Sequence, residues 1–147
     1  MSQFLTHTAV SPQGESRWQA EVHRGWRIGS VANGGYVLAL VGRTLAEALN
    51  QPDPLSINAF YLAPVALGEV EVAVESLSET RSTHFASADL RQEGELKLRA
   101  TAAYTDLDKL KGPDWTNVIP PDVPAFDDAA SLAMSHLEIH QSIDLRM

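Results

Sequence analysis

The sequence contains no cysteine among its 147 residues, which excludes disulfides, thiolate metal sites and cysteine nucleophiles. Basic residues are also scarce: 11 lysines and arginines stand against 19 aspartates and glutamates, a net charge of −8. That balance argues against a nucleic-acid surface, because phosphate binding requires clustered cations. No apolar run approaches the roughly 20 residues that cross a bilayer, and the first residues lack the pattern of a secretory signal. We therefore expect a cytoplasmic protein with no membrane span.

The residues that are present fit one compact body followed by an acidic extension. Residues 106–147 carry 3 basic and 8 acidic side chains and four of the eight prolines. Since proline has no N–H donor and a fixed φ, the stretch Ile119-Pro120-Pro121-Asp122-Val123-Pro124 cannot be an interior strand or helix. We predict a compact domain at residues 1–107, a Pro-rich acidic linker with a short helix at 108–135, and a separate segment at 136–147.

A helical period begins after Gly34-Gly35 and ends before Pro52 and Pro54. Its apolar residues recur three or four positions apart: Val37, Leu40, Val41, Leu45, Ala48 and Leu49. Only a narrow polar face remains, at Arg43, Glu47 and Asn50. A helix with so little polar surface is expected to be covered on most sides.

Strand-like alternation surrounds this helix in the sequence. It occurs once before the helix and four times after it, in residues 18–22, 55–61, 69–75, 85–92 and 96–104. Residues 92–95 (Gln-Glu-Gly-Glu) are typical of a hairpin turn, and short turns imply antiparallel neighbours. The order predicts an α+β fold, in which a five-stranded antiparallel sheet wraps around one long central helix.

This pattern resembles the hotdog fold, and several short motifs are similar to the N-terminal half of the acyl-CoA thioesterase II-like, double-hotdog family. The motifs are Trp26-Arg27-Ile28, residues 33–40 (NGGYVLAL), 56–64 (SINAFYLAP), 68–72 (GEVEV) and 80–83 (TRST). The resemblance covers about residues 15 to 124. One departure is Thr80, which stands where the family usually has a glycine, so a positive φ at that turn would be strained.

The resemblance implies a single hotdog with a Pro-rich acidic C-terminal extension, and a hydrolase that cleaves acyl-CoA thioesters without a cofactor. Residues 136–147 resemble the first strand of a second hotdog, cut short. The family places its water-orienting Asp, Gln and Ser/Thr in that second hotdog, and no position here matches them. A lone hotdog also leaves a sheet edge and one face uncovered. We therefore expect a homo-oligomer or pairing with a second hotdog domain.

Thioester hydrolysis requires donors aimed at the developing oxyanion and a group that positions water. The helix start offers the donors, because its first N–H groups have no partner within the helix and carry the positive end of its dipole. We take Asn33, Gly34, Gly35 and Tyr36 as the candidate site for the oxyanion and acyl-CoA. The structural alternative is that Asn33 caps the helix and the glycines allow tight packing. Residues 35–41 contain no acid, amide, hydroxyl-bearing Ser or Thr, or histidine, so the catalytic residues stay unassigned.

A second hypothesis is a non-catalytic hotdog that binds acyl groups or a partner subunit, and the missing acid favours it. A hotdog dehydratase is a weaker third, because that chemistry would need an Asp/His pair near the helix start. His136 and His140 have the spacing of a helical metal pair, but no third ligand follows, so solvent-facing histidines and no metal site are the better interpretation.

Two further groups of side chains have a structural and a functional interpretation. Trp26, Ile28 and Tyr36 either line an acyl pocket or plug the open end of the sheet, and packing is favoured. Arg81 and Arg91 either contact the phosphates of coenzyme A or are ordinary exposed arginines at strand ends.

Overall fold

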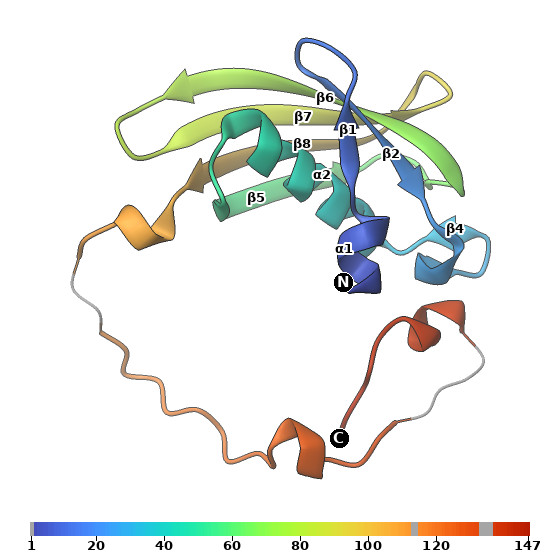
Figure 1. The fold of residues 1–147 in the computed structure, drawn as a ribbon, viewed down its shortest axis with the longest axis vertical. Coiled ribbons are helices and arrows are strands. Elements are labelled where there is room, and N and C mark those ends of the chain that lie inside the picture. The colour runs from blue at the N-terminus through green and yellow to red at the C-terminus, as the bar shows by residue number, and fades with distance from the viewer. Residues whose placement is uncertain (1, 113–114, 133–136) are drawn as a thin grey trace.

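A computed structural model describes residues 2–112, 115–132 and 137–147 (Figure 1). Its α-helices are α1 (Gln3–His7) and α2 (Gly34–Leu49). Its strands are β1 (Val10–Pro12), β2 (Arg17–Val22), β3 (Arg27–Ile28), β4 (Val31–Ala32), β5 (Asp53–Tyr61), β6 (Gly68–Glu79), β7 (His84–Gln92) and β8 (Glu95–Thr105). Short 3-10 helices are η1 (Arg24–Trp26), η2 (Leu107–Lys109), η3 (Phe126–Asp128) and η4 (Glu138–Gln141).

The main sheet is antiparallel throughout and curls around α2 (Figure 1), which confirms the predicted architecture. The predicted number of strands was wrong: the sheet has six, in the order β1-β2-β6-β7-β8-β5. The additional strand, β1, pairs Val10 with Ala20 of β2 at one edge of the sheet. It has three residues and ends at Pro12, so it shows no alternation in the sequence, and a proline is tolerated there because the strand is at an edge.

Helix α2 fills the concave side of the sheet. Leu40, Val41 and Leu45 are completely buried, and fully buried side chains of β6, β7 and β8 (Val72, Leu90 and Leu98) belong to the same core. The expectation that the helix is covered on most sides holds only for this face. The face with Leu38, Ala39, Gly42 and Ala46 is half-buried and borders a groove.

The two turns that the sequence singled out differ in how they are made. Between β7 and β8, Glu93 (φ 52°) and Gly94 (φ 82°) both have positive φ, which confirms the predicted hairpin turn. Between β6 and β7, Thr80 does not have a positive φ. There the Thr80 N–H donates to the Thr83 carbonyl (2.8 Å) and the Thr83 N–H donates to Thr80 Oγ1 (3.1 Å). A hydroxyl side chain therefore closes the turn without strain.

After β8 the chain leaves the body, and its end returns to the opposite side of the molecule (Figure 1). Residues 115–125 contain no helix or strand, and η3 follows them. Residues 138–141 form η4 where the sequence suggested a strand, and the nearest pairing is an isolated bridge between Ser131 and Arg146. The division into a domain at 1–107, a linker at 108–135 and a further segment at 136–147 stays a prediction.

Candidate active site at the start of the central helix

Asn33 caps the N-terminus of α2, as the structural interpretation predicted. Its backbone is extended (φ −62°, ψ 134°), and its Oδ1 accepts a hydrogen bond from the Tyr36 N–H at 3.2 Å. Its carbonyl accepts from the Val37 N–H at 3.0 Å, and its own N–H donates to the Trp26 carbonyl at 2.8 Å. The start of the helix is therefore fixed both to its own first turn and to η1.

Two N–H groups at this end remain available. Among the described residues, none accepts a hydrogen bond from the N–H of Gly34 or of Gly35. Both N–H groups lie at the positive end of the α2 dipole, and Gly35 is exposed. Since neither residue has a side chain, a carbonyl group of a ligand could approach the backbone closely.

Tyr61, at the end of β5, lies next to this pair of glycines and was not predicted as a site residue. Its hydroxyl donates to the Gly34 carbonyl at 2.9 Å. A Cβ built on Gly34 would lie 3.3 Å from Tyr61 Cε1, so the ring packs directly on the glycine. Burial of part of the ring raises the pKa of the phenol, which keeps the hydroxyl a donor at neutral pH. Tyr61 occurs in the motif at 56–64, but nothing in that motif indicates its contact with Gly34.

A groove of about 420 Å³ runs from Gly35 along the half-buried face of α2. Its walls are mainly apolar: Leu38, Ala39, Gly42, Ala46, Pro52, Pro54, Ile57 and Tyr104, with Arg43 at its side. The Tyr104 hydroxyl donates to the Gly42 carbonyl at 2.8 Å, and burial raises the pKa of Tyr104 to about 12. This phenol therefore stays protonated across the physiological range and acts as a structural donor.

No acid, amide, serine, threonine or histidine lies in the first two turns of α2, and the Tyr36 hydroxyl there is engaged by backbone carbonyls. The next hydroxyl, Thr44, is completely buried and donates to the Leu40 carbonyl at 2.9 Å. Glu47 forms an ion pair with Arg43 at 3.6 Å near the other end of the helix, and an Asp53 carboxylate oxygen accepts from the Leu107 N–H at 2.9 Å. The first two acids that follow the helix start in the sequence therefore have structural partners.

Tyr36 contributes its backbone to the helix start, while its side chain plugs the end of the sheet together with Trp26. Their rings stack with centroids 5.4 Å apart, and both residues are buried. The Tyr36 hydroxyl donates to the carbonyl of His7 (2.6 Å), and Trp26 Nε1–H donates to His7 Nδ1 (3.0 Å). This confirms the packing interpretation for the two aromatic rings, whereas Ile28 is 45% exposed.

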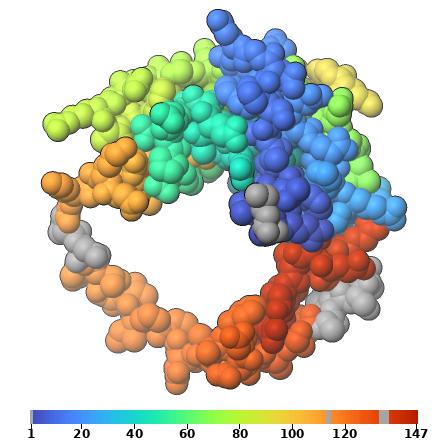
Figure 2. Space-filling view, viewed as in Figure 1, coloured from blue at the N-terminus to red at the C-terminus, as the bar shows by residue number. Residues whose placement is uncertain are grey.

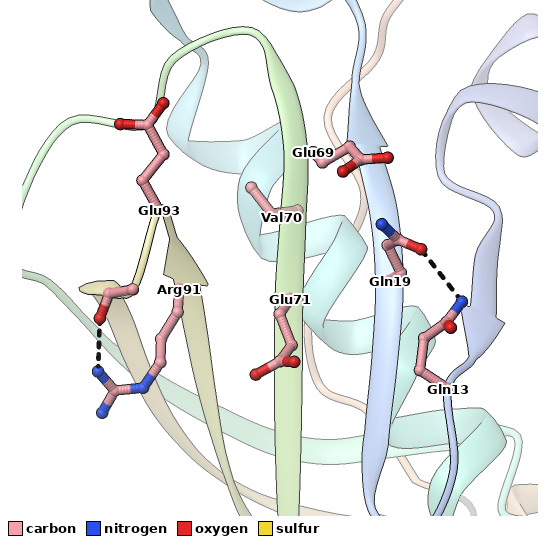
Figure 3. A pocket seen from close by; sticks show the side chains of 8 residues that line it. Gln13, Gln19, Glu69, Val70, Glu71, Arg91 and Glu93 are labelled. Carbon is pink, nitrogen blue, oxygen red and sulfur yellow. Dashed lines mark hydrogen bonds between the residues drawn. The ribbon is translucent and has the colours of Figure 1, made fainter.

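A second hollow, of about 470 Å³, lies on the outer face of the sheet and is lined by Glu69, Glu71 and Glu93 together with Arg91 (Figure 3). Arg91 donates to the Gly94 carbonyl at 3.2 Å within this hollow. Three carboxylates beside one guanidinium disfavour the phosphates of coenzyme A. Arg81 is exposed near the β6–β7 turn. Neither arginine lies at the helix start.

Other classes of site find no support in the described part of the chain. No three His, Asp or Glu side chains there are grouped as metal ligands, and no helix among those residues is long and apolar enough to span a membrane. Of the histidine pair noted in the sequence, His140 lies half-buried in η4 and His136 lies outside the described residues.

Comparison with known proteins places this geometry in a family. Residues 22–105 match the family described as the acyl-CoA thioesterase N-terminal domain. Comparison with curated proteins gives no significant match. Among solved structures, a protein of Thermobifida fusca YX designated a thioesterase II is 27% identical, with a TM-score of 0.81 over 91% of this chain and 50% of that one.

Two further structures share the fold at lower identity. One is a protein of Novosphingobium aromaticivorans DSM 12444 designated a thioesterase (19% identity, TM-score 0.81, covering 94% of this chain and 57% of that one). The other is a protein of Alicyclobacillus acidocaldarius described as having a hot dog fold (22% identity, TM-score 0.78, covering 96% of this chain and 53% of that one). The chain thus spans about half the length of each of these three structures. It has a single hotdog fold, corresponds to half of the double-hotdog thioesterase II-like structures, and belongs to the acyl-CoA thioesterase N-terminal domain family.

Proposed function

We propose that this chain is one half of an acyl-CoA thioesterase, and that the N–H groups of Gly34 and Gly35 bind the carbonyl oxygen of the thioester. The observation that carries the proposal is a pair of N–H groups that have no acceptor among the described residues, at the start of the central helix in a chain of this family. Attack of water on the carbonyl carbon would place negative charge on that oxygen, and donors already in place stabilise it. Breakage of the C–S bond then yields the free acid and the thiol of coenzyme A.

The acyl chain would lie along the groove that starts at Gly35. Its apolar walls suit a hydrocarbon chain, and the groove leads directly away from the proposed carbonyl site. It is open along its length, so a second surface is needed to exclude water from the bound acyl chain. The phosphates of coenzyme A would remain outside it, beyond the helix start.

A second hotdog unit would supply that surface and the missing water-orienting group. Strand β5 forms one edge of the sheet, since β8 is the one strand that it pairs with among the described residues. Phe60 and the adjoining Leu62 are 70% and 55% exposed. An edge with open backbone groups and exposed apolar side chains invites pairing with another strand. The second unit would therefore seat against β5 and close the groove along α2.

The donor role can be tested by replacing Gly34, the first residue of α2. Gly34→Pro removes the N–H, and the first helical position tolerates proline; the extended backbone of Asn33 also fits a residue before proline. Gly34→Ala adds a similar contact with Tyr61 but keeps the N–H, so it is the matched control. We expect Gly34→Pro to weaken acyl-CoA binding about tenfold in calorimetry, the equivalent of about 1.4 kcal/mol, and Gly34→Ala to bind nearly as the wild type. Equal affinities for all three proteins would contradict the role.

A non-catalytic binding half is the second candidate, favoured by the absence of an acid from the first turn of α2. An assay of acyl-CoA hydrolysis, in which the appearance of the free thiol is measured, distinguishes the two candidate functions. If the chain is one half of a thioesterase, we expect it to bind acyl-CoA without a partner. We expect it to hydrolyse acyl-CoA when it is paired with a hotdog domain that carries the water-orienting acid. Binding that is never accompanied by turnover in that pairing would favour the second candidate.

A further inference from the structure

Two arginine side chains, one on η1 and one on β3, converge on a single carboxylate. The Arg27 guanidinium group donates through Nε and through Nη2 (3.0 Å) to the two carboxylate oxygens of Glu138. Arg24 Nε donates to one of the same oxygens at 2.8 Å. Arginine binds phosphate through the same forked arrangement of N–H groups, so the pair forms an anion site in which Glu138 is the bound anion.

The carboxylate in this site comes from a distant part of the chain and lies near the surface. Glu138 anchors η4 to the body, and Figure 2 shows the C-terminal residues (red) lying against the blue N-terminal part, where η4 contacts η1 and β3. The side chains of Arg24 and Glu138 are 71% and 32% exposed. Since water and salt reach an ion pair of this kind, another anion can displace the carboxylate.

The arginine pair is tied through the backbone to the proposed carbonyl site. Arg27 pairs with Ala32 between β3 and β4, and Ala32 stands two residues before Gly34. Antiparallel partners lie about 4.5–5.5 Å apart, so the Cα atoms of Arg27 and Gly34 are separated by at most about 13 Å. The Asn33 N–H also donates to the Trp26 carbonyl, which fixes η1 to the start of α2. The extended pantetheine arm, which joins the thioester of acyl-CoA to its phosphates, is of similar length.

The charge around this pair also suits an anionic ligand. In a chain with a net charge of −8, a ligand with several phosphates is repelled except where cations are clustered. Arg91 and Arg99 also share one acid, Asp89, but Arg91 borders the hollow that three glutamates line. In the described part of the chain, no carboxylate other than that of Glu138 pairs with Arg24 or Arg27. The pair therefore carries an excess of positive charge, which doubles when Glu138 leaves.

We propose that Arg24 and Arg27 bind the phosphate groups of coenzyme A, and that Glu138 occupies their site until the ligand displaces it. The inference rests on the proposed function and adds a site for the nucleotide end of the substrate. The thioester carbonyl would bind at Gly34 and Gly35 and the phosphates at the arginines, with the pantetheine arm between them. Several phosphate oxygens offer more charge than one carboxylate and accept the same forked hydrogen bonds, which favours the exchange.

Titration calorimetry of the complete 147-residue chain with two thioesters tests this site. Hexanoyl-CoA carries the phosphates, and hexanoyl-pantetheine has the same acyl group and arm without a phosphate. We expect Arg27→Gln to weaken the binding of hexanoyl-CoA about tenfold and to leave that of hexanoyl-pantetheine unchanged, because only contacts with phosphate are lost. Arg17→Gln is the matched control: it removes the same charge from an exposed, ion-paired arginine on β2, and it should bind both ligands as the wild type does.

Glu138→Gln separates the loss of the competing carboxylate from the loss of the arginines. Like Arg27→Gln it breaks the ion pairs that hold η4, but it keeps both guanidinium groups. We expect this variant to bind hexanoyl-CoA about threefold more tightly than the wild type, and hexanoyl-pantetheine equally well. If it binds hexanoyl-CoA no more tightly than the wild type, the displacement of Glu138 is overturned.

The outcomes separate the phosphate site from the proposed function. If Arg27→Gln weakens both thioesters equally, or has the same effect as Arg17→Gln, the phosphate site is overturned. If Gly34→Pro weakens both thioesters and Arg27→Gln weakens neither, the phosphate site is overturned and the carbonyl site stands. If Arg27→Gln weakens hexanoyl-CoA alone and Gly34→Pro changes neither, the carbonyl site is overturned and the phosphate site stands. A wild-type chain that binds neither thioester overturns both.

Discussion

At the residue scale, Asn33 determines which N–H groups a ligand can use at the start of α2. Its side chain and carbonyl occupy the N–H groups of Tyr36 and Val37, and the N–H groups of Gly34 and Gly35 are left. Asn33 therefore stabilises the start of the helix, and the proposed binding role falls to the two neighbouring glycines.

Asn33→Ala should destabilise the protein by about 1 kcal/mol, because the Tyr36 N–H loses its acceptor. Asn33→Ser, whose hydroxyl can accept the same hydrogen bond, should restore most of that loss. Urea unfolding followed by circular dichroism measures both. If alanine and serine variants are equally stable, the cap contributes no measurable stability.

His7 should make stability depend on pH. Burial, and secondarily the neighbouring His23, lowers the pKa of His7, whose Nδ1 accepts the hydrogen bond from Trp26. The unfolded chain therefore binds a proton more readily than the folded one, and stability present above about pH 6.5 is lost as the pH falls below it.

We expect the free energy of unfolding to drop by about 1 kcal/mol between pH 7.5 and 5.5, roughly the value of one hydrogen bond. His7→Gln offers Trp26 an acceptor that does not titrate, so the drop should be smaller in that variant. An identical drop in both proteins would assign the effect to other groups.

The sequence predicted the cap at Asn33 because an amide before a helical period is a local signal. It could not predict Tyr61 beside Gly34. That contact joins the end of β5 to the start of α2, and it depends on how the strand lies across the helix rather than on the identity of either residue.

At the scale of elements, α2 has one face buried by its own sheet and one half-buried face that borders the groove. Its period predicted the helix and its core residues correctly. It could not distinguish the two faces, because Ala39, Gly42 and Ala46 count as apolar whether the sheet of this chain or another unit covers them. Strand β1 was missed for a related reason, since three residues carry too little pattern to be recognised.

Substitutions on the two faces of α2 should differ in cost. Leu40→Ala empties a completely buried position and should cost about 2–5 kcal/mol. Leu38→Ala, on the half-buried face, should cost about 1 kcal/mol or less. Thermal or urea unfolding of the two variants, side by side, measures the difference. Equal losses would mean that the groove face is as tightly packed as the core.

The η4 element should detach from the body when Glu138 loses its charge. Hydrogen bonds from Arg27 and then Arg24 hold the pKa of Glu138 below its ordinary value. The attachment is therefore present at neutral pH. It is lost as the pH falls below the ordinary pKa of a glutamate and then through the lowered pKa of Glu138. Glu138→Gln should bring about the same loss at pH 7.

Hydrogen exchange of residues 137–146 measures this detachment. The amides of these residues should exchange faster in Glu138→Gln than in the wild type, while those of β6–β8 stay unchanged. Asp144→Asn is a suitable control, because Asp144 pairs with Arg146 within the same segment and not with the body. Faster exchange in the control alone would contradict the anchor.

At the scale of the whole molecule, this chain has a single hotdog fold, and the start of its central helix lacks the acid that the proposed hydrolysis requires. It contains a groove, an edge strand and the proposed carbonyl site, but the first two turns of α2 carry no acid, amide or histidine to orient water. Sequence patterns could predict this division only through the family resemblance. No local sequence pattern indicates whether a helix face or a strand edge would be covered by a second unit.

The binding of a thioester carbonyl by the N–H groups of Gly34 and Gly35 is most directly tested by infrared spectroscopy of acyl-CoA labelled with ¹³C at that carbonyl. Hydrogen bonding polarises the C=O bond and lowers its stretching frequency. We expect a shift to lower frequency on binding to the wild type and to Gly34→Ala, and a clearly smaller shift with Gly34→Pro. A thioester that binds with the same carbonyl frequency to all three proteins, or with the frequency it has in water, would contradict the account.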